Sequence, residues 1–203
     1  MTDLALLAVL WIIWCILHSL LIAPPVVRLM RRTFGSAYRY YRLAYNGVAL
    51  VSLAGVVWFQ FSLPRTVLLP HALLQLPWAL VWVLPLGGAA FFFWSGARAY
   101  DLRVFLGLAQ LRSHPSSSPG TLQLHGVLRH VRHPWYTATI LLMLAWFDGT
   151  DVSLLMRVVL IVYTIIGAVL EERKLVAEFP DTYPRYRRAV PMLVPRLRPA
   201  REI

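Results

Sequence analysis

The chain has 203 residues, of which 59% are hydrophobic and 14% are charged, and its formal net charge is +11. Soluble domains carry about 25% charged residues, so this composition and a mean hydropathy of +0.62 exclude an ordinary soluble protein. All the basic residues except Lys174 are arginines, and they lie beside apolar segments. The positive-inside rule explains that placement, so we expect membrane lipids and no nucleic acid as partners.

The apolar segments in chain order are residues 4–22, 43–63, 66–97 and 152–170. A membrane-spanning helix needs about 20 apolar residues, and each segment is close to that length or longer. The first has no basic region before it and no small-residue cleavage site after it, so we interpret it as a retained helix and not a signal peptide. The third contains Pro85, Gly87 and Gly88, which predict a kink or the close approach of a neighbouring helix.

A further apolar segment runs from Pro134 to Phe147. As a helix it would be about 21 Å long, which is less than the hydrocarbon core requires. The residues 148–151 read Asp-Gly-Thr-Asp, the composition of a tight turn. The segment and residues 152–170 are therefore predicted to form a helical hairpin.

The charges of the connections alternate along the chain. Basic connections occupy residues 23–42, 98–132 and the tail after 170. By contrast, residues 63–73 contain one arginine, and the only charged residues in 147–151 are two aspartates. Five spans place every basic connection on one side, with the N-terminus outside and the C-terminus in the cytoplasm. We therefore predict an all-α, polytopic helical bundle in the inner or plasma membrane, as a single domain. Its parts would be residues 1–100 (three spans), 101–133 (a cytoplasmic connector), 134–170 (the hairpin) and 171–203 (a cytoplasmic tail).

Polar residues collect at one predicted depth, the cytoplasmic mouth of the bundle. Ionisable residues near hydrocarbon are costly and often functional, although each of these alone has an ordinary explanation as an ion pair, a topology signal or an interfacial anchor. The single Cys15 offers no disulfide framework and no cysteine metal motif, and we predict no metal site. The polar group comprises His18, Asn46, Asp101, Gln110, Arg129, His130, Arg132, His133, Glu171 and Glu172.

The C-terminal half carries a recognisable pair of motifs. Residues 122–136 read LQLHGVLRHVRHPWY, and residues 171–186 read EERKLVAEFPDTYPRY. The pair resembles the signature of the isoprenylcysteine carboxyl methyltransferase and phospholipid methyltransferase superfamily, over roughly residues 120–196. Two positions depart from that signature, namely Leu128, where an aromatic residue is common, and Pro180, where glycine is usual.

The N-terminal half is similar to the NnrU-like and nurim-like branch, near which the bacterial methanethiol S-methyltransferases also lie. The similarity rests on His18-Ser19, on residues 41–46 (YRLAYN) and on residues 101–108 (DLRVFLGL).

The resemblance implies S-adenosylmethionine as the methyl donor, held in a cytoplasmic pocket between the hairpin and the tail. It also implies a lipophilic or small acceptor, which can be a carboxylate, a thiol or an amine. Expected catalytic residues are Arg132, Glu171 and His18, acting mainly by positioning. Expected cofactor-binding residues are Leu124, His125, Gly126, Arg129, Arg132, His133, Pro134, Tyr136, Glu171, Glu172, Tyr183 and Tyr186.

Two other classes stay open on the sequence alone. A nurim-like structural or binding protein would keep the fold without catalysis, and its polar cluster would be ion pairing only. A transporter would need polar residues through the depth of the bundle. Here the spans have almost no charged residues outside the third of their length that is nearest the cytoplasm. The sequence does not indicate the oligomeric state or the identity of the acceptor.

Overall fold

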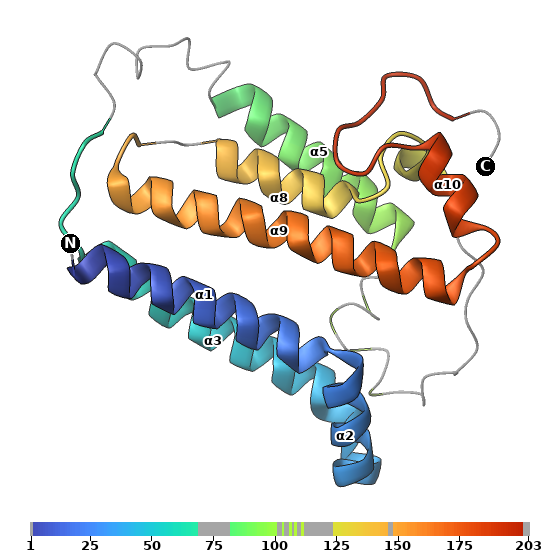
Figure 1. The fold of residues 1–203 in the computed structure, drawn as a ribbon, viewed down its shortest axis with the longest axis horizontal. Helices are drawn as coiled ribbons and strands as arrows, with labels where there is room; N and C mark the ends of the chain where they lie inside the picture. Colours follow the sequence, from blue (N-terminus) through green and yellow to red (C-terminus); the bar gives the residue numbers. More distant parts are fainter. Residues whose placement is uncertain are drawn as a thin grey trace. The chain divides into compact units, whose positions relative to one another are not determined.

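The structure is a computed structural model that describes residues 2–68, 82–100, 124–145 and 148–200, together with residues 103, 106, 108 and 111. Within this part, the regular elements are helices (Figure 1), and the extended backbone makes one isolated bridge, between Val67 and Thr150. The predicted all-α fold is confirmed. The chain divides into two compact units, and each is described by itself.

The first unit is a pair of long helices joined by a short basic segment. Helix α1 (Thr2–Ile22) is followed by α2 (Pro24–Phe34), the 3-10 turn η1 (Gly35–Tyr40) and α3 (Tyr41–Ser62). Two prolines at the start of α2 suit the first turn of a helix, where no N–H partner is needed. Helix α2 ends at Phe34, and its C-cap Gly35 has a positive φ of 49°, which glycine adopts more readily than other residues.

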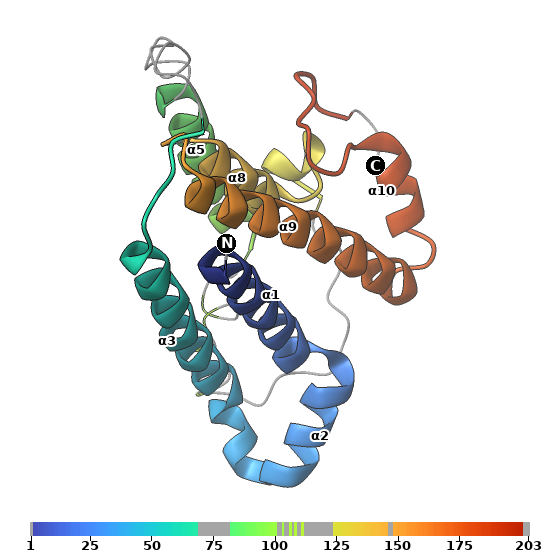
Figure 2. The ribbon, with the colours of Figure 1, turned by 60° about the vertical axis from the view of Figure 1, so that its left-hand side comes forward.

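Helices α1 and α3 pack side by side (Figure 2). Leu7, Trp11 and Cys15 recur every fourth residue on α1, so they share one face, and all three are buried. The Trp11 indole Nε1 donates to Gln60 Oε1 at 3.0 Å in this buried seam. The two polar groups therefore satisfy each other where water is excluded.

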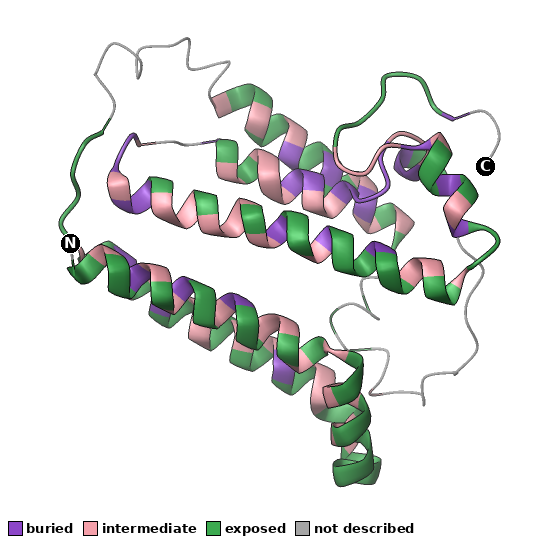
Figure 3. Ribbon diagram, in the orientation of Figure 1, coloured by how far each residue is buried: buried purple, intermediate pink, exposed green. Residues whose placement is uncertain are grey.

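Three helical segments are long and apolar enough to cross a membrane: Thr2–Ile22, Pro24–Ser62 and Asp151–Glu178. Only 17% of the most apolar window of the first is buried inside the protein, so most of its apolar surface needs lipid as its solvent. Figure 3 shows this as long exposed stretches on α1 and α3. The chain is thus a membrane protein, while the count of five spans and the orientation stay predictions. Part of the predicted third span lies outside the described residues.

The second unit contains α5 (Leu84–Ala99), η3 (Gly126–Arg129), α8 (Pro134–Leu144), α9 (Asp151–Glu178) and α10 (Tyr183–Ala189). Helix α8 packs against both α5 and α9. The predicted close approach occurs at Gly88, where an added Cβ would lie 3.0 Å from Leu141. A second close approach, which was not predicted, occurs at Gly96, where an added Cβ would overlap the Trp135 ring. Gly87 instead faces open space.

The predicted hairpin is present, and its first arm is short. With 11 residues and a rise of about 1.5 Å each, α8 is roughly 16 Å long. Gly149 adopts a φ of 70°, and Thr150 caps α9 by accepting from the Ser153 N–H at 3.3 Å. Arg157 then donates to the Ala145 carbonyl at 2.7 Å, which ties α9 to the end of α8.

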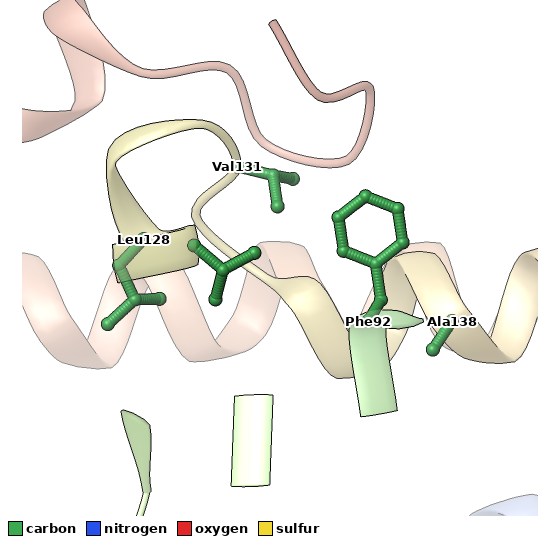
Figure 4. Close-up of a cluster of buried hydrophobic side chains, with 5 residues drawn as sticks. Phe92, Leu128, Val131 and Ala138 are labelled. Carbon is green, nitrogen blue, oxygen red and sulfur yellow. The ribbon is translucent and has the colours of Figure 1, made fainter. Parts of the chain in front are cut away.

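Two apolar clusters hold the connector and the tail in place. Phe92, Leu128, Val131 and Ala138 join α5, η3 and α8 (Figure 4). The second cluster holds α10 against the end of α9, and its buried members are Tyr183, Tyr186, Val190 and Ala200. Leu128, a departure from the family signature, is therefore a buried core residue.

Candidate functional site

The tail is hydrogen-bonded directly to the connector that precedes α8. Backbone N–H groups of Arg132 and His133 donate to Pro191 and Met192 at 3.0 and 3.2 Å, and Ala200 N–H donates to the Arg129 carbonyl at 3.0 Å. Thr137 Oγ1 adds a bond of 2.8 Å to the Leu193 carbonyl. The tail therefore forms a fixed wall beside the start of α8.

Glu172 is the centre of the polar cluster. Its Oε1 accepts from Arg132 Nε at 2.5 Å and from the Tyr183 hydroxyl at 3.3 Å, and it lies 3.4 Å from His133 Nε2. Its Oε2 lies 3.2 Å from Arg187 Nε. One carboxylate thus joins α8's connector, α9 and α10.

Arg132 and Glu172 form a buried ion pair, with side-chain exposures of 8% and 6%. The Arg132 Nη1 also donates to the carbonyls of Arg187 and Val190. A buried charge pair is stable only when such further hydrogen bonds satisfy it. The donors of Arg132 and the acceptors of Glu172 are therefore largely used within the protein.

His133 lies between the two glutamates. Its Nδ1 is 4.0 Å from Glu171 Oε2, and the side chain is 4% exposed. Burial lowers the pKa of His133 below its usual value, and the charges of Glu171 and Glu172 only partly oppose that effect. The imidazole is therefore neutral at pH 7.

Glu171 differs from its neighbour because its side chain is 44% exposed. The Tyr136 ring lies beside it, 5.5 Å from the His133 ring between centroids, and a Cβ added at Gly167 of α9 would lie 3.7 Å from that ring. An accessible carboxylate, a neutral imidazole and an aromatic face thus meet at the open side of the cluster.

The two tail tyrosines are packed groups. Tyr183 and Tyr186 are 1% and 2% exposed, and the Tyr186 hydroxyl donates to the Leu128 carbonyl at 2.7 Å. Burial raises the pKa of both phenols. Both remain protonated, so they serve as hydrogen-bond donors that attach α10 to the site.

The other predicted cofactor-binding residues divide between two places. Arg129 donates to the Ala200 carbonyl at 2.9 Å, and Leu124 packs on the tail cluster. Pro134 is buried at the first position of α8. His125 and Gly126 instead line a separate pocket. Gly126 has a φ of 59°, and a Cβ there would meet nothing, so its conformation is what requires glycine.

Four further polar residues of the prediction belong to the first unit or lie outside the described residues. The His18 ring stacks on Trp14 and lies 2.9 Å from the Tyr45 hydroxyl. Asn46 Nδ2 donates to the Leu106 carbonyl at 3.0 Å. Asp101 and Gln110 are outside the described residues. A single cluster that includes these residues therefore stays a prediction.

Two contributors were not identified from the sequence. Arg187 supplies a second cation to Glu172, and it stands four residues after Tyr183 on α10, a spacing that places both on one face. Thr137 ties α8 to the tail, and it stands four residues after His133. Helical spacing from a motif residue was the available signal in both cases.

Comparisons with known proteins find partial similarity to two methyltransferases. No family model matches the chain, and no solved structure matches it. Methanethiol S-methyltransferase 2 of Bradyrhizobium diazoefficiens is 45% identical over 67 residues, which are 33% of this chain and 26% of that protein. Methanethiol S-methyltransferase 1 of the same organism is 34% identical over 92 residues, 44% of this chain and 32% of that protein. The chain thus matches less than a third of the length of each relative.

Proposed function

We propose that this chain is an integral membrane methyltransferase that uses S-adenosylmethionine and acts at the cytoplasmic face. We further propose a small thiol as its acceptor, because the two similar proteins are named methanethiol S-methyltransferases. A lipophilic carboxylate or amine is the other acceptor chemistry that the sequence resemblance implies.

The observation that carries the proposal is the contrast between the two adjacent glutamates. Glu172 is 6% exposed and holds the connector, α9 and α10 together. Glu171 is 44% exposed and stands beside His133 and Tyr136. The first arrangement fixes the site, and the second leaves an acidic and aromatic edge that a ligand can reach.

These residues fit the charges of the donor. Its ammonium group or a ribose hydroxyl would bind Glu171, and the Tyr136 ring offers a face to its sulfonium. Its carboxylate needs a cation, and Arg187, which is 50% exposed, is better placed for that than Arg132 or Arg129. In this proposal Arg132 and Glu172 act as positioning residues.

The chain's own contribution to the reaction is alignment and one proton acceptor. The donor, when bound, supplies an already activated methyl group, so holding the acceptor in line provides much of the rate enhancement. A thiol must lose its proton as the new sulfur–carbon bond forms, and the Glu171 carboxylate oxygen that does not bind the donor can take it. His18, held by Tyr45 and Trp14 within the first unit, stays a predicted catalytic residue.

A non-catalytic membrane protein is the second candidate, and one observation favours it. The buried polar groups of the site mostly pair with one another, since Arg132, Glu172 and Tyr183 share hydrogen bonds within the protein. A structural protein would need no more than that network. It would not bind the donor or its product.

The test is the thermal stability of the purified protein in detergent, with S-adenosylmethionine, with S-adenosylhomocysteine and with neither. A ligand at 100 times its Kd stabilises the native state by about 2.7 kcal/mol, so both compounds should raise the unfolding temperature. The shift should disappear in His133→Ala and persist in Glu178→Gln, which removes an exposed charge farther along α9.

Activity with a short alkyl thiol then separates the acceptor classes. Transfer of a labelled methyl group to the thiol, and not to a prenylated cysteine carboxylate or a phospholipid amine, would support the thiol assignment. A folded, monodisperse protein that neither binds the donor nor transfers a methyl group would support the structural candidate instead.

A further inference from the structure

A pocket of about 570 Å³ lies in the second unit, apart from the Glu172 cluster. The last turns of α5 form one side, the η3 segment forms another, and residues 195–197 of the tail close the third. Its lining shares no residue with the group of Arg132, His133, Glu171 and Glu172. The proposed methyl transfer therefore leaves this pocket without a role.

The pocket wall is apolar and open to the outside of the protein. Phe91 and Trp94 on α5 are 54% and 55% exposed, and Leu197 of the tail is 99% exposed. Val194, just before the pocket segment, is 77% exposed. Large apolar side chains this exposed, on a membrane protein and beside one pocket, indicate contact with lipid.

The rim of the pocket is basic. Arg98 lies over the Trp94 ring at 3.9 Å from the centroid, and Arg196 and His130 stand across from α5. None of the described lining residues is acidic. The arginines lie at the end of α5 and in the tail, on the side where the connections are basic.

Hydrogen bonds fix the tail side of the rim. Arg196 N–H donates to the His130 carbonyl at 3.0 Å, and His130 Nδ1 lies 2.8 Å from the Arg196 carbonyl. Arg196 Nη1 donates to the Ala189 carbonyl at 2.5 Å, which orients the guanidinium. A binding site whose charged groups are already ordered loses less entropy when a ligand binds.

We propose that this pocket binds one anionic phospholipid of the leaflet that faces the basic connections. The phosphate contacts Arg98 and Arg196, with His130 nearby, and an acyl chain lies along Phe91 and Trp94. Arginine suits phosphate because its planar fork of donors matches the oxygens. The site differs from a general attraction to acidic lipid, since it combines fixed cations with an apolar wall and holds a single molecule.

The methyl donor is a poorer occupant for the same pocket. Its ammonium and sulfonium groups are positive, and the lining offers arginines and no acid. A soluble anion such as free phosphate would contact the basic residues of the rim but not the apolar side chains of the wall. The proposal does not rest on the proposed function and can hold for a catalytic or a structural protein.

The test is native mass spectrometry of the whole protein in detergent, titrated with phosphatidylglycerol or phosphatidylcholine. We expect one tightly retained phosphatidylglycerol per chain and at least tenfold weaker retention in the double variant R98Q/R196Q. The matched control R185Q/R188Q removes two exposed arginines of α10 and should bind as the wild type does. Ser95→Phe, which fills the pocket without changing the charge, should also lose the tight adduct.

Three results would overturn the proposal. Equal retention in R98Q/R196Q and R185Q/R188Q would mean that the arginines act only through overall charge. Unchanged retention in Ser95→Phe would place the lipid elsewhere. Displacement of the lipid by millimolar inorganic phosphate would identify a soluble-anion site. An unchanged helical signal in the circular dichroism spectrum of each variant would show that a lost lipid adduct does not result from unfolding.

Discussion

The two units bury polar groups in different ways. In the first, two hydrogen bonds between α1 and α3 join side chains that carry no formal charge when His18 is neutral: Trp11 donates to Gln60 at 3.0 Å, and the Tyr45 hydroxyl lies 2.9 Å from His18. In the second, the central contact is an ion pair, between Arg132 and Glu172, supported from α10 and the tail. Neutral pairs within two packed helices need only each other, whereas a buried charge pair needs partners from several segments. In the second unit, the buried ion pair and the residues of the proposed site therefore lie in one cluster.

The largest effect should follow removal of the central carboxylate. Glu172→Ala leaves Arg132 buried and uncompensated, and breaking a buried pair in this way costs about 3–5 kcal/mol. We expect a large fall in the thermal unfolding temperature in detergent. Glu178→Ala on the exposed part of the same helix is the control, and equal stability of the two variants would show that Glu172 is not the centre of the network.

Overpacking between α5 and α8 should have the next largest effect. In Gly96→Ala the added Cβ would overlap the Trp135 ring, whereas in Gly87→Ala it meets nothing within 4 Å. Inserting carbon into a packed interface costs about 1–3 kcal/mol. The unfolding temperature of Gly96→Ala should lie well below that of the wild type, and that of Gly87→Ala should equal or exceed it. The reverse order would contradict the packing of these two helices.

The neutral seam of the first unit should respond more weakly. Gln60→Leu removes the acceptor of Trp11, and hydrogen bonds between membrane helices contribute about 0.6 kcal/mol on average. The double variant W11F/Q60L should recover part of the loss because neither polar group is then left unpaired. If Gln60→Leu lost as much stability as Glu172→Ala, the proposed difference between the neutral contacts of the first unit and the ion pair of the second would be wrong.

The smallest effect should be a dependence of stability on pH. The pKa of His133 is lowered in the folded protein by burial, so the unfolded chain binds a proton more readily near pH 6. The contribution of His133 is present above its unfolded pKa of about 6.5 and is lost as the pH falls toward its folded pKa. Unfolding temperatures from pH 8 to pH 5 should fall less in His133→Gln than in the wild type. His125→Gln, an exposed change on the same connector, should follow the wild type.

Local sequence rules predicted much of this fold. Apolar length placed α1, α3 and α9, and the run Asp148-Gly149-Thr150-Asp151 predicted the turn that Thr150 caps and Gly149 permits. The short α8 followed from the small separation between Pro134 and that turn. Gly96 was not identified, because nothing in one sequence says that a tryptophan of another helix will lie over a given glycine.

The site was predicted less completely, for a physical reason. The motifs identified Arg132, His133, Glu171 and Glu172, but adjacent glutamates look alike in a sequence. Only the packing of the tail and α10 makes one of them 6% and the other 44% exposed. Arg187 was not identified because its role depends on the turn that brings α10 back to α9.

That contrast between the adjacent glutamates is tested most directly by measuring S-adenosylhomocysteine binding calorimetrically, together with unfolding temperature, in Glu171→Gln and Glu172→Gln. If the account is right, Glu171→Gln keeps the stability of the wild type and loses binding at least tenfold, whereas Glu172→Gln loses stability. If Glu171→Gln binds the compound as the wild type does, the exposed carboxylate has no part in holding the donor, and the proposed site is wrong.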